Sequence, residues 1–278
     1  MERRDTTRGR AARPRQEAPQ ASATPEGAAG PREGGDEQPG PDADWVPVPE
    51  GPVRVAIVID DVGFEEKPAL DLARLGLPIT FAILPHQRYS RVLARKLPRM
   101  GQEVILHLPM EPVDYPERNP GRGAVREGMT PEQIEATVLE ALDGVPGAIG
   151  LNNHMGSRVT ADPRMMRPIL EVVRRRGLYF LDSRTTDETV AYDLAREMGL
   201  RAVKRSVFLD DMRQASYIEG QVRGLLQKAR EQGSALAIGH ADPVTVEVLK
   251  RSVSLFRSGD IRVVPASELA AAGQGGSG

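Results

Sequence analysis

Eight short apolar runs, most of them separated by amphipathic helical patterns, constrain the fold of this chain more than any other feature. The runs are rich in β-branched residues, which is typical of strands that are buried on both faces of a sheet. Because parallel strands need helical crossovers, their order predicts an α/β protein with a parallel sheet. The runs are Val53–Ile59, Ile79–Leu84, Val104–Leu106, Ala148–Leu151, Leu178–Leu181, Val207–Leu209, Ala235–Ile238 and Ile261–Val264.

Start signals mark several of the intervening helices. The segment Thr130–Gln133 combines an N-cap residue, a proline at the first helical position and a capping-box glutamine. Asp242-Pro243 opens a second helix in the same way, and its apolar pattern continues to Phe256. Asp162-Pro163 resembles another start, although Pro168 then predicts a kink or a later beginning. A fourth helix is expected over the apolar residues between positions 218 and 229.

So many strand–helix units in about 220 residues favour an irregular parallel (β/α) barrel of seven to eight strands. A doubly wound open sheet fits less well, because no Gly-x-Gly-x-x-Gly pattern follows the first strand. The barrel is predicted to span residues 51–269. Residues 1–50 are rich in Pro, Gly and Arg and are predicted to be a disordered tail or linker, and residues 270–278 a flexible tail.

Composition removes several classes of function. With 37 Lys+Arg against 39 Asp+Glu, the net charge of −2 argues against binding nucleic acid through a broad basic surface. No apolar stretch is long enough to span a membrane or to form the core of a secretory signal. The chain has no cysteine, which excludes thiolate nucleophiles and Cys-ligated metals. Any metal ion must therefore be bound by His, Asp, Glu or Asn.

Polar residues follow seven of the apolar runs, and all four histidines are among them. In a parallel barrel these positions lie on the C-terminal face, where barrel enzymes carry their active sites. The polar positions, in chain order, are Asp60-Asp61, His86, His107, Asn152–His154, Asp182–Arg184, Asp210-Asp211 and His240–Asp242. Of the histidines, His86 is expected to be a loop residue.

Such a group of residues supports metal-assisted hydrolysis. Two imidazoles and a carboxylate can bind zinc and leave one position open for water. A second carboxylate can then accept the proton of that water, and a further histidine can protonate the leaving group. Asp60 and Asp61 are adjacent, so both can reach one site only if the backbone turns at the strand end. Val62-Gly63 permits such a turn.

Several motifs resemble a known family. Ile59–Gly63, Thr80–Ala82 and Gly101–His107 are similar to the polysaccharide deacetylase superfamily, which is carbohydrate esterase family 4 with the NodB-like fold. Leu106–Glu111, Leu151–Ser157 and Ile238–His240 resemble its branch of divergent polysaccharide deacetylases. The resemblance implies zinc-dependent removal of acetyl groups from N-acetylated sugars of a carbohydrate such as a cell-wall polymer. It also suggests a periplasmic or cell-envelope location.

The resemblance assigns roles to four residues. Asp60 matches the catalytic base of the family, and Asp61 matches its aspartate metal ligand. His107 matches the first histidine of the His-x-x-x-His metal motif, and His240 matches the general acid. The second histidine position of the metal motif holds Glu111 instead.

Three departures from the family pattern leave alternatives open. The third metal ligand is either Glu111 or His154, and we prefer His154 because Glu111 follows Pro109 and is expected in a loop. In place of the Arg-x-Pro motif that steadies the base stands Asn152–His154, so Arg158, Arg184 or no residue takes that role. The aspartate that orients the acid histidine is Asp182, Asp210 or Asp211, and Asn153 is a further candidate for support.

Three functions are compatible with the sequence. The first is a metal-dependent hydrolase that removes acetyl groups from amino sugars. The second is a barrel that has lost part of the deacetylase site and binds a saccharide or a protein without catalysis. The third is a metal-dependent hydrolase with another substrate, such as a phosphate ester. Of these, the first is our expectation.

Overall fold

The computed structural model describes residues 51–272. The disorder predicted for residues 1–50 lies outside these residues, as does all but the first three residues of the flexible tail predicted for residues 270–278. At the C-terminal end the fold continues past Leu269, where the sequence analysis places its limit. The last helix, α9, spans Ala266–Ala272, and Ala270 is fully buried.

Within the described residues, nine strands form one sheet in which every pairing is parallel. The strand order is β6-β5-β4-β3-β2-β1-β8-β7, and β9 pairs with the first residues of β1. The strands are β1 (Val53–Val62), β2 (Thr80–Ile83), β3 (Glu103–Met110), β4 (Gly150–Met155), β5 (Tyr179–Asp182), β6 (Ala202–Lys204), β7 (Val207–Phe208), β8 (Ser234–His240) and β9 (Ile261–Val263).

The two edge strands, β6 and β7, follow each other directly in the chain. Only Arg205 and Ser206 separate them, and the backbone of these two residues forms hydrogen bonds to β5 near one edge of the sheet and to β8 near the other. The Arg205 N–H donates to the Asp182 carbonyl, and the Ser206 N–H donates to the Leu236 carbonyl. The sheet therefore curls into the irregular barrel that the sequence predicts. The sequence analysis missed β6, because this strand has only three residues and a single partner strand.

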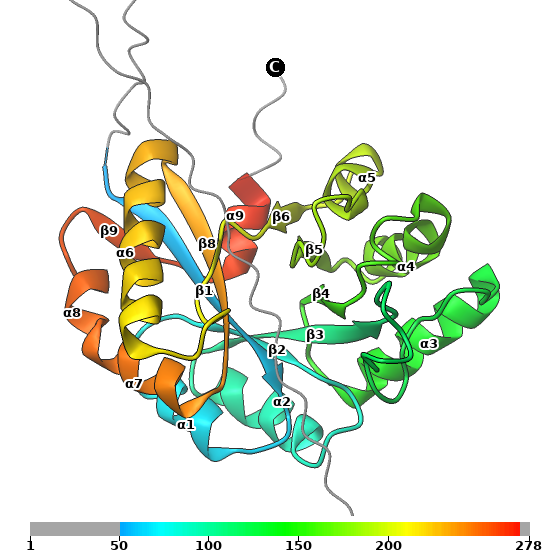
Figure 1. Ribbon diagram of the computed structural model, residues 1–278, viewed down its shortest axis with the longest axis horizontal. Helices are drawn as coiled ribbons and strands as arrows, with labels where there is room; N and C mark the ends of the chain where they lie inside the picture. Colours follow the sequence, from blue (N-terminus) through cyan, green and yellow to red (C-terminus); the bar gives the residue numbers. More distant parts are fainter. Residues whose placement is uncertain (1–50, 273–278) are drawn as a thin grey trace, which may run out of the picture. The chain divides into compact units, whose positions relative to one another are not determined.

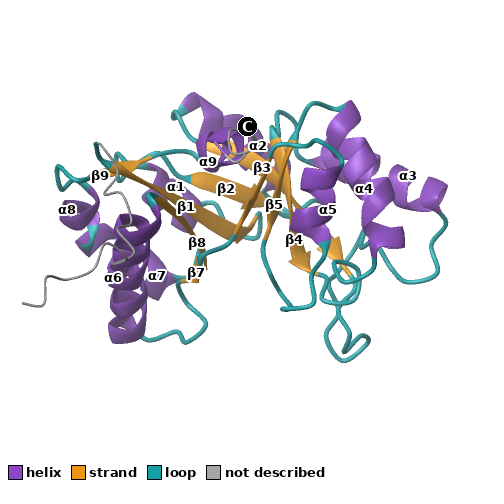
Figure 2. Ribbon diagram, turned by 90° about the horizontal axis from the view of Figure 1, so that it is seen from above, coloured by secondary structure: helices purple, strands orange, loops and turns teal. Residues whose placement is uncertain are grey.

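Of the nine helices within the described residues, α1 to α8 pack on the outside of the sheet and α9 packs on its inner face. Figure 1 shows α1, α6 and α7 beside β1 and β8, and α3, α4 and α5 beside β3 to β5. In the view from above, strands run between these two groups of helices (Figure 2). The helices before α9 are α1 (Lys67–Ala73), α2 (Ser90–Arg99), α3 (Pro131–Gly144), α4 (Pro163–Arg175), α5 (Ala191–Glu197), α6 (Ala215–Gln232), α7 (Pro243–Arg251) and α8 (Val253–Phe256).

The predicted helix starts occur where the capping chemistry indicates. Thr130 caps α3 with a complete capping box, and Asp242 caps α7. Asp162 caps α4, which begins at Pro163 and contains Pro168. The alternative prediction that this helix begins later in the sequence is therefore wrong. The pattern that continues to Phe256 is divided between α7 and the short α8.

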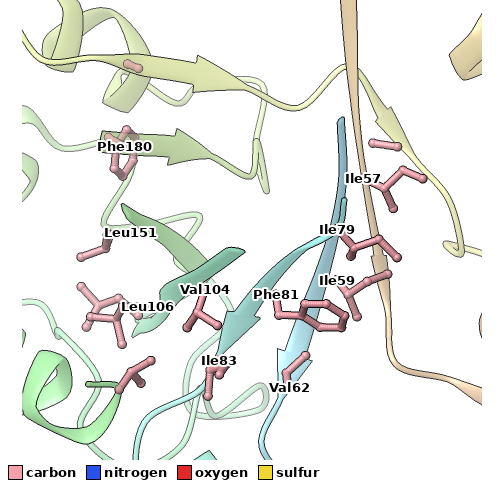
Figure 3. Close-up of a cluster of buried hydrophobic side chains, with 14 of the residues drawn as sticks. Ile57, Ile59, Val62, Ile79, Phe81, Ile83, Val104, Leu106, Leu151 and Phe180 are labelled. Atoms are coloured by element: carbon pink, nitrogen blue, oxygen red, sulfur yellow. The ribbon is translucent and has the colours of Figure 1, made fainter. Parts of the chain in front are cut away.

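Side chains alternate along the strands between two apolar layers. One layer lies between the sheet and the helices and includes Ile57, Phe81 and Leu106 (Figure 3). The other fills the inside of the barrel and includes Val58 and Ile105 together with residues of α9. The inner apolar layer stops before the C-terminal ends of the strands. The last inward-facing residues of these strands are polar.

None of the helices within residues 51–272 is long and apolar enough to cross a membrane.

Candidate active site

The carboxylates of Asp60 and Asp61 reach the same place because β1 contains a bulge. The three-residue step from Ile59 to Val62 is matched by a two-residue step of β2. Asp61 has a φ of 57°, in the left-handed region that aspartate tolerates better than most residues. Both carboxylates lie within 3.6 Å of His107 Nε2. The turn that the sequence predicts at Val62-Gly63 therefore begins one residue earlier, at Asp61.

Three potential ligand atoms converge beside this bulge. Asp61 Oδ1 lies 3.2 Å from His107 Nε2 and 2.8 Å from His154 Nδ1. The two imidazole nitrogens are 3.2 Å apart. His107 is inward-facing on β3 and His154 on β4, and the two strands are neighbours in the sheet. This is the one group of three or more His, Cys, Asp or Glu ligands of this kind within the described residues.

The geometry of this group fits a tetrahedral zinc ion. Ligand atoms about 2.0–2.1 Å from such an ion lie about 3.3–3.4 Å from one another, close to two of the separations and somewhat longer than the 2.8 Å between Asp61 and His154. Asp61 Oδ1 is buried and accepts no hydrogen bond of normal geometry. A buried carboxylate oxygen without a hydrogen bond is costly unless a cation compensates it. Two imidazoles and one carboxylate are also a donor set that zinc accepts.

Glu111, the alternative third ligand, is engaged elsewhere. Its Oε1 lies 3.1 Å from Arg158 Nε, and its Oε2 accepts a hydrogen bond from the Glu127 N–H. Arg158 also contacts the Glu127 carboxylate and the Val113 carbonyl. Glu111 and Arg158 thus join the segments that follow β3 and β4, apart from the three converging atoms.

A residue that the sequence analysis did not select, Asn152, connects the site. Its side chain is fully buried on β4. Its Oδ1 lies 2.8 Å from His107 Nδ1, and its Nδ2 donates to Asp60 Oδ1 at 2.9 Å and to Ser183 Oγ at 3.1 Å. The contact at Nδ1 directs the opposite nitrogen of His107 toward Asp61, as ligand-orienting partners do in metal sites.

The carboxyl group of Asp60 is buried, and its burial determines the direction of its pKa shift. Only 4% of its surface is exposed, and burial raises the pKa of its carboxyl group. The positive charges of His107 and His240 and the hydrogen bond from Asn152 act in the opposite direction but do not outweigh burial. A carboxylate with a raised pKa is a better proton acceptor than an ordinary one.

His240 is held from the opposite side by Asp210. His240 Nδ1 lies 3.0 Å from Asp210 Oδ1, while the backbone N–H of His240 and the Thr245 hydroxyl both donate to Asp210 Oδ2. Burial opposes protonation of His240, but the hydrogen bond and charge of Asp210 prevail and raise its pKa to about 9. Its Nε2 lies 3.7 Å from Asp61 Oδ2.

Comparison with known proteins places the chain in a family. The model of the divergent polysaccharide deacetylases matches residues 57–270, which include the whole site. The chain belongs to the divergent polysaccharide deacetylase family. An uncharacterized protein of Haemophilus influenzae is 38% identical over 197 residues, which cover 71% of this chain and 70% of that protein.

Two solved structures resemble the fold of this member of the divergent polysaccharide deacetylase family. An uncharacterized protein of Agrobacterium tumefaciens C58 superposes with a TM-score of 0.74 at 23% identity, covering 79% of this chain and 90% of that one. The catalytic domain of peptidoglycan N-acetylglucosamine deacetylase from Eubacterium rectale gives a TM-score of 0.50 at 15% identity, covering 81% and 94%. At these identities, the likeness shows the NodB-like fold.

Of the three aspartates considered for orienting the acid histidine, the deacetylase fold brings Asp210 to His240. Asp182 is fully buried but accepts hydrogen bonds from the Arg184 N–H, the Thr189 hydroxyl and the Tyr192 N–H, so it shapes the segment after β5. Asp211 is exposed.

The remaining predicted support residues do not contact Asp60. Asn153 points away from the inner face of β4. On the outer side it donates a hydrogen bond to the Met155 carbonyl and accepts one from the Ser183 N–H. The guanidinium of Arg184 contacts only Asp187. His86 lies in a separate cavity beside Glu140, at 3.8 Å. In this chain the side-chain hydrogen bond to Asp60 comes from Asn152.

The site opens into a cleft of about 1190 Å³. The cleft is lined by Asp60, Asp61, His107, His154 and His240, so the three converging atoms, the buried Asp60 carboxylate and the His240 ring share one opening. Segments after β3, β4 and β5 form one wall of the cleft, and β7 and α6 form the other. The cleft can therefore bring a bound molecule to all five side chains at once.

Proposed function

We propose that the protein is a zinc-dependent hydrolase that removes acetyl groups from N-acetylated sugars of a polysaccharide. The observation that carries the proposal is the convergence of Asp61, His107 and His154 between a buried carboxylate and a histidine paired with Asp210. Membership of the divergent polysaccharide deacetylase family supports a carbohydrate substrate. The likeness in fold to a peptidoglycan N-acetylglucosamine deacetylase agrees with this.

In this proposal Asp61, His107 and His154 bind the zinc ion. When bound there, zinc polarises the acetyl carbonyl and lowers the pKa of water. Asn152 holds His107 and Asp60 in a fixed relation through its two side-chain hydrogen bonds. This arrangement positions the proton acceptor beside the metal ligands before a substrate enters.

The two proton transfers are assigned to Asp60 and His240. Asp60 accepts a proton from water as the water oxygen forms a bond to the acetyl carbon. His240 donates a proton to the sugar nitrogen as the C–N bond breaks, which yields acetate and an amine. A pKa of about 9 keeps His240 protonated at neutral pH, and burial makes Asp60 a stronger base, so each residue suits its role.

The test measures acetate release from N-acetylated oligosaccharides by the zinc-loaded full-length chain. Asp60→Asn keeps the size of the side chain and can still accept the Asn152 hydrogen bond, so we expect zinc to remain bound. Loss of the base should lower turnover by about 10²–10⁴-fold. A wild-type protein that binds zinc but releases no acetate from any of the oligosaccharides would favour the saccharide-binding alternative.

A further inference from the structure

The cleft continues past the proposed reaction centre as a groove beside α6. Tyr217, Gln221, Gly224 and Lys228 line it, spaced at helical intervals so that they occupy one face of α6. This face adjoins the buried face of the helix, and all four residues are partly buried. From the first to the last, the groove runs about 16 Å along the helix axis. It is therefore longer than a single sugar ring.

Two cations line the groove without a carboxylate partner within residues 51–272. Arg205 Nε donates to the Ser183 carbonyl and Nη2 to the Arg184 carbonyl, each at 2.7 Å, and its guanidinium lies over the ring of Phe208. These contacts hold the side chain still but leave three of its N–H groups free. Lys228 Nζ has one contact, with the Ser206 carbonyl at 3.3 Å.

The charge of Arg205 is poorly compensated by its surroundings. Burial lowers the pKa of its guanidinium, and the positive charge of Arg184 lowers it further, while the more distant carboxylates of Asp182, Asp60 and Asp187 act in the opposite direction without outweighing burial. An anionic ligand in the groove would relieve both effects. Charge-assisted hydrogen bonds to a carboxylate or phosphate are also the strongest that a fixed guanidinium can form.

The floor of the groove is open at Gly224. A Cβ atom there would have no neighbour within 4 Å, although glycine is unfavourable inside a helix. Gly220, one turn earlier, has equally open surroundings but is exposed and does not line the cleft. Tyr217 and Gln221 beside the floor have no side-chain hydrogen bond within the described part of the chain, so they are free to bind hydroxyl groups of a sugar.

The carboxylates of the cleft lie outside this groove. Asp114 and Glu188 belong to segments on the opposite wall, after β3 and β5. Asp211 follows Asp210, the partner of His240, and so lies at the end nearest the reaction centre. The opposite wall also contains Arg118 and Arg184, but each of these is paired with a carboxylate, whereas Arg205 and Lys228 have no such partner within residues 51–272.

We propose that this groove binds the part of the substrate next to the reacting sugar, and that Arg205 and Lys228 select a substrate with an anionic group at that position. The inference rests on the proposed function, because it extends the substrate of the same site. The ligand class is an acidic oligosaccharide whose carboxylate or phosphate group lies one or more sugars from the acetylated one.

The experiment compares three N-acetylated trisaccharides of equal length as probes. One is neutral, one carries a uronic acid carboxylate, and one carries a phosphate ester on the sugar next to the acetylated end. Binding is measured by calorimetry on the full-length Asp60→Asn chain, so that turnover does not interfere. We expect at least one acidic probe to bind about tenfold more tightly than the neutral probe, and added salt to reduce the difference.

Two matched pairs of variants locate the effect. Lys228→Gln should abolish the preference for the acidic probe and leave binding of the neutral probe unchanged, while Lys228→Arg should retain the preference. Gly224→Leu fills the floor and should weaken binding of all three probes by about tenfold. Gly220→Leu, on the same helix and equally free of steric conflict, should bind like the parent chain.

The outcomes separate the two proposals. Equal binding of the three probes, or identical behaviour of the Gly224→Leu and Gly220→Leu variants, would overturn the groove while acetate release by the wild type continued to support the hydrolase. A preference for an acidic probe that Lys228→Gln abolishes would support the groove. That result would hold even if the wild type released no acetate and the hydrolase proposal failed.

Discussion

The two ends of the barrel interior both contain polar side chains, but their atoms are paired very differently. At the end where the strands begin, Glu103 Oε1 accepts hydrogen bonds from the Tyr179 hydroxyl at 2.7 Å, the Thr80 hydroxyl at 2.8 Å and the Ser267 N–H at 3.2 Å. The N-terminal residues of α9 cover this cluster. Its donors are matched to one acceptor, as expected for a polar cluster that stabilises a fold.

At the end where the strands stop, the polar atoms face one another without such matching. Asp61 Oδ1 lacks a normal hydrogen bond, although two imidazole nitrogens lie within 3.2 Å. The comparison teaches that burial of polar groups alone does not mark a functional site in this barrel. The distinguishing feature is a buried carboxylate oxygen that lies close to two imidazole nitrogens at the base of a cleft.

The largest expected effect of a single change is at Asp61. Asp61→Asn preserves the size of the side chain and tolerates the positive φ, but it removes the anionic ligand. We expect zinc affinity to fall by at least about 100-fold, because even partners of metal ligands contribute about 10- to 100-fold. The metal-free variant should be somewhat less stable than the wild type, because His107 and His154 outweigh burial and hold the pKa of the Asp61 carboxyl well below its usual range. Zinc titration and thermal unfolding of both proteins test this, and a variant that binds zinc as tightly as the wild type would contradict the role of Asp61.

A second prediction concerns the acid histidine. In the metal-free protein, NMR titration of the His240 ring should have a midpoint near pH 9, because Asp210 stabilises the protonated form. Asp210→Asn removes that charge, so the midpoint should fall by more than about one unit, equivalent to about 1.4 kcal/mol. An unchanged midpoint would show that Asp210 does not set the protonation of His240.

The smallest effect is expected at the opposite end of the barrel. Tyr179→Phe removes one of three donors to Glu103 and should lower the free energy of unfolding by about 1 kcal/mol. The melting temperature should then drop by about 2–4 °C, with zinc content and turnover unchanged. A loss of zinc in this variant would mean that the two ends are not independent.

Much of this arrangement follows from alternation along the strands. His107 and His240 each lie two positions after an apolar inner-layer residue, and His154 lies three positions after the outer-layer residue Leu151, so the pattern predicts that all three face inward. The same rule would have found Asn152, which is two residues from His154. The sequence analysis instead treated Asn152–His154 as residues beyond the strand, because polar residues usually end one.

Other features depend on contacts that no local pattern contains. Strict alternation directs Asp61 outward, and only the bulge at its positive φ brings it to His107. The pairing of Asp210 with His240 depends on the register of β7 beside β8, and β7 has only two residues. The sequence therefore predicted the barrel and the convergence of Asp61, His107 and His154, but not which aspartate or asparagine contacts the histidines.

The most direct test of the account is the zinc content of three full-length chains that have been loaded with zinc and dialysed. The wild type and Glu111→Gln should each retain about one ion per chain, and His154→Gln should retain less than about 0.1. Glu111→Gln serves as the matched control, because it alters a buried charge near the site without touching the three converging atoms. Zinc retained by His154→Gln and lost from Glu111→Gln would contradict the central claim.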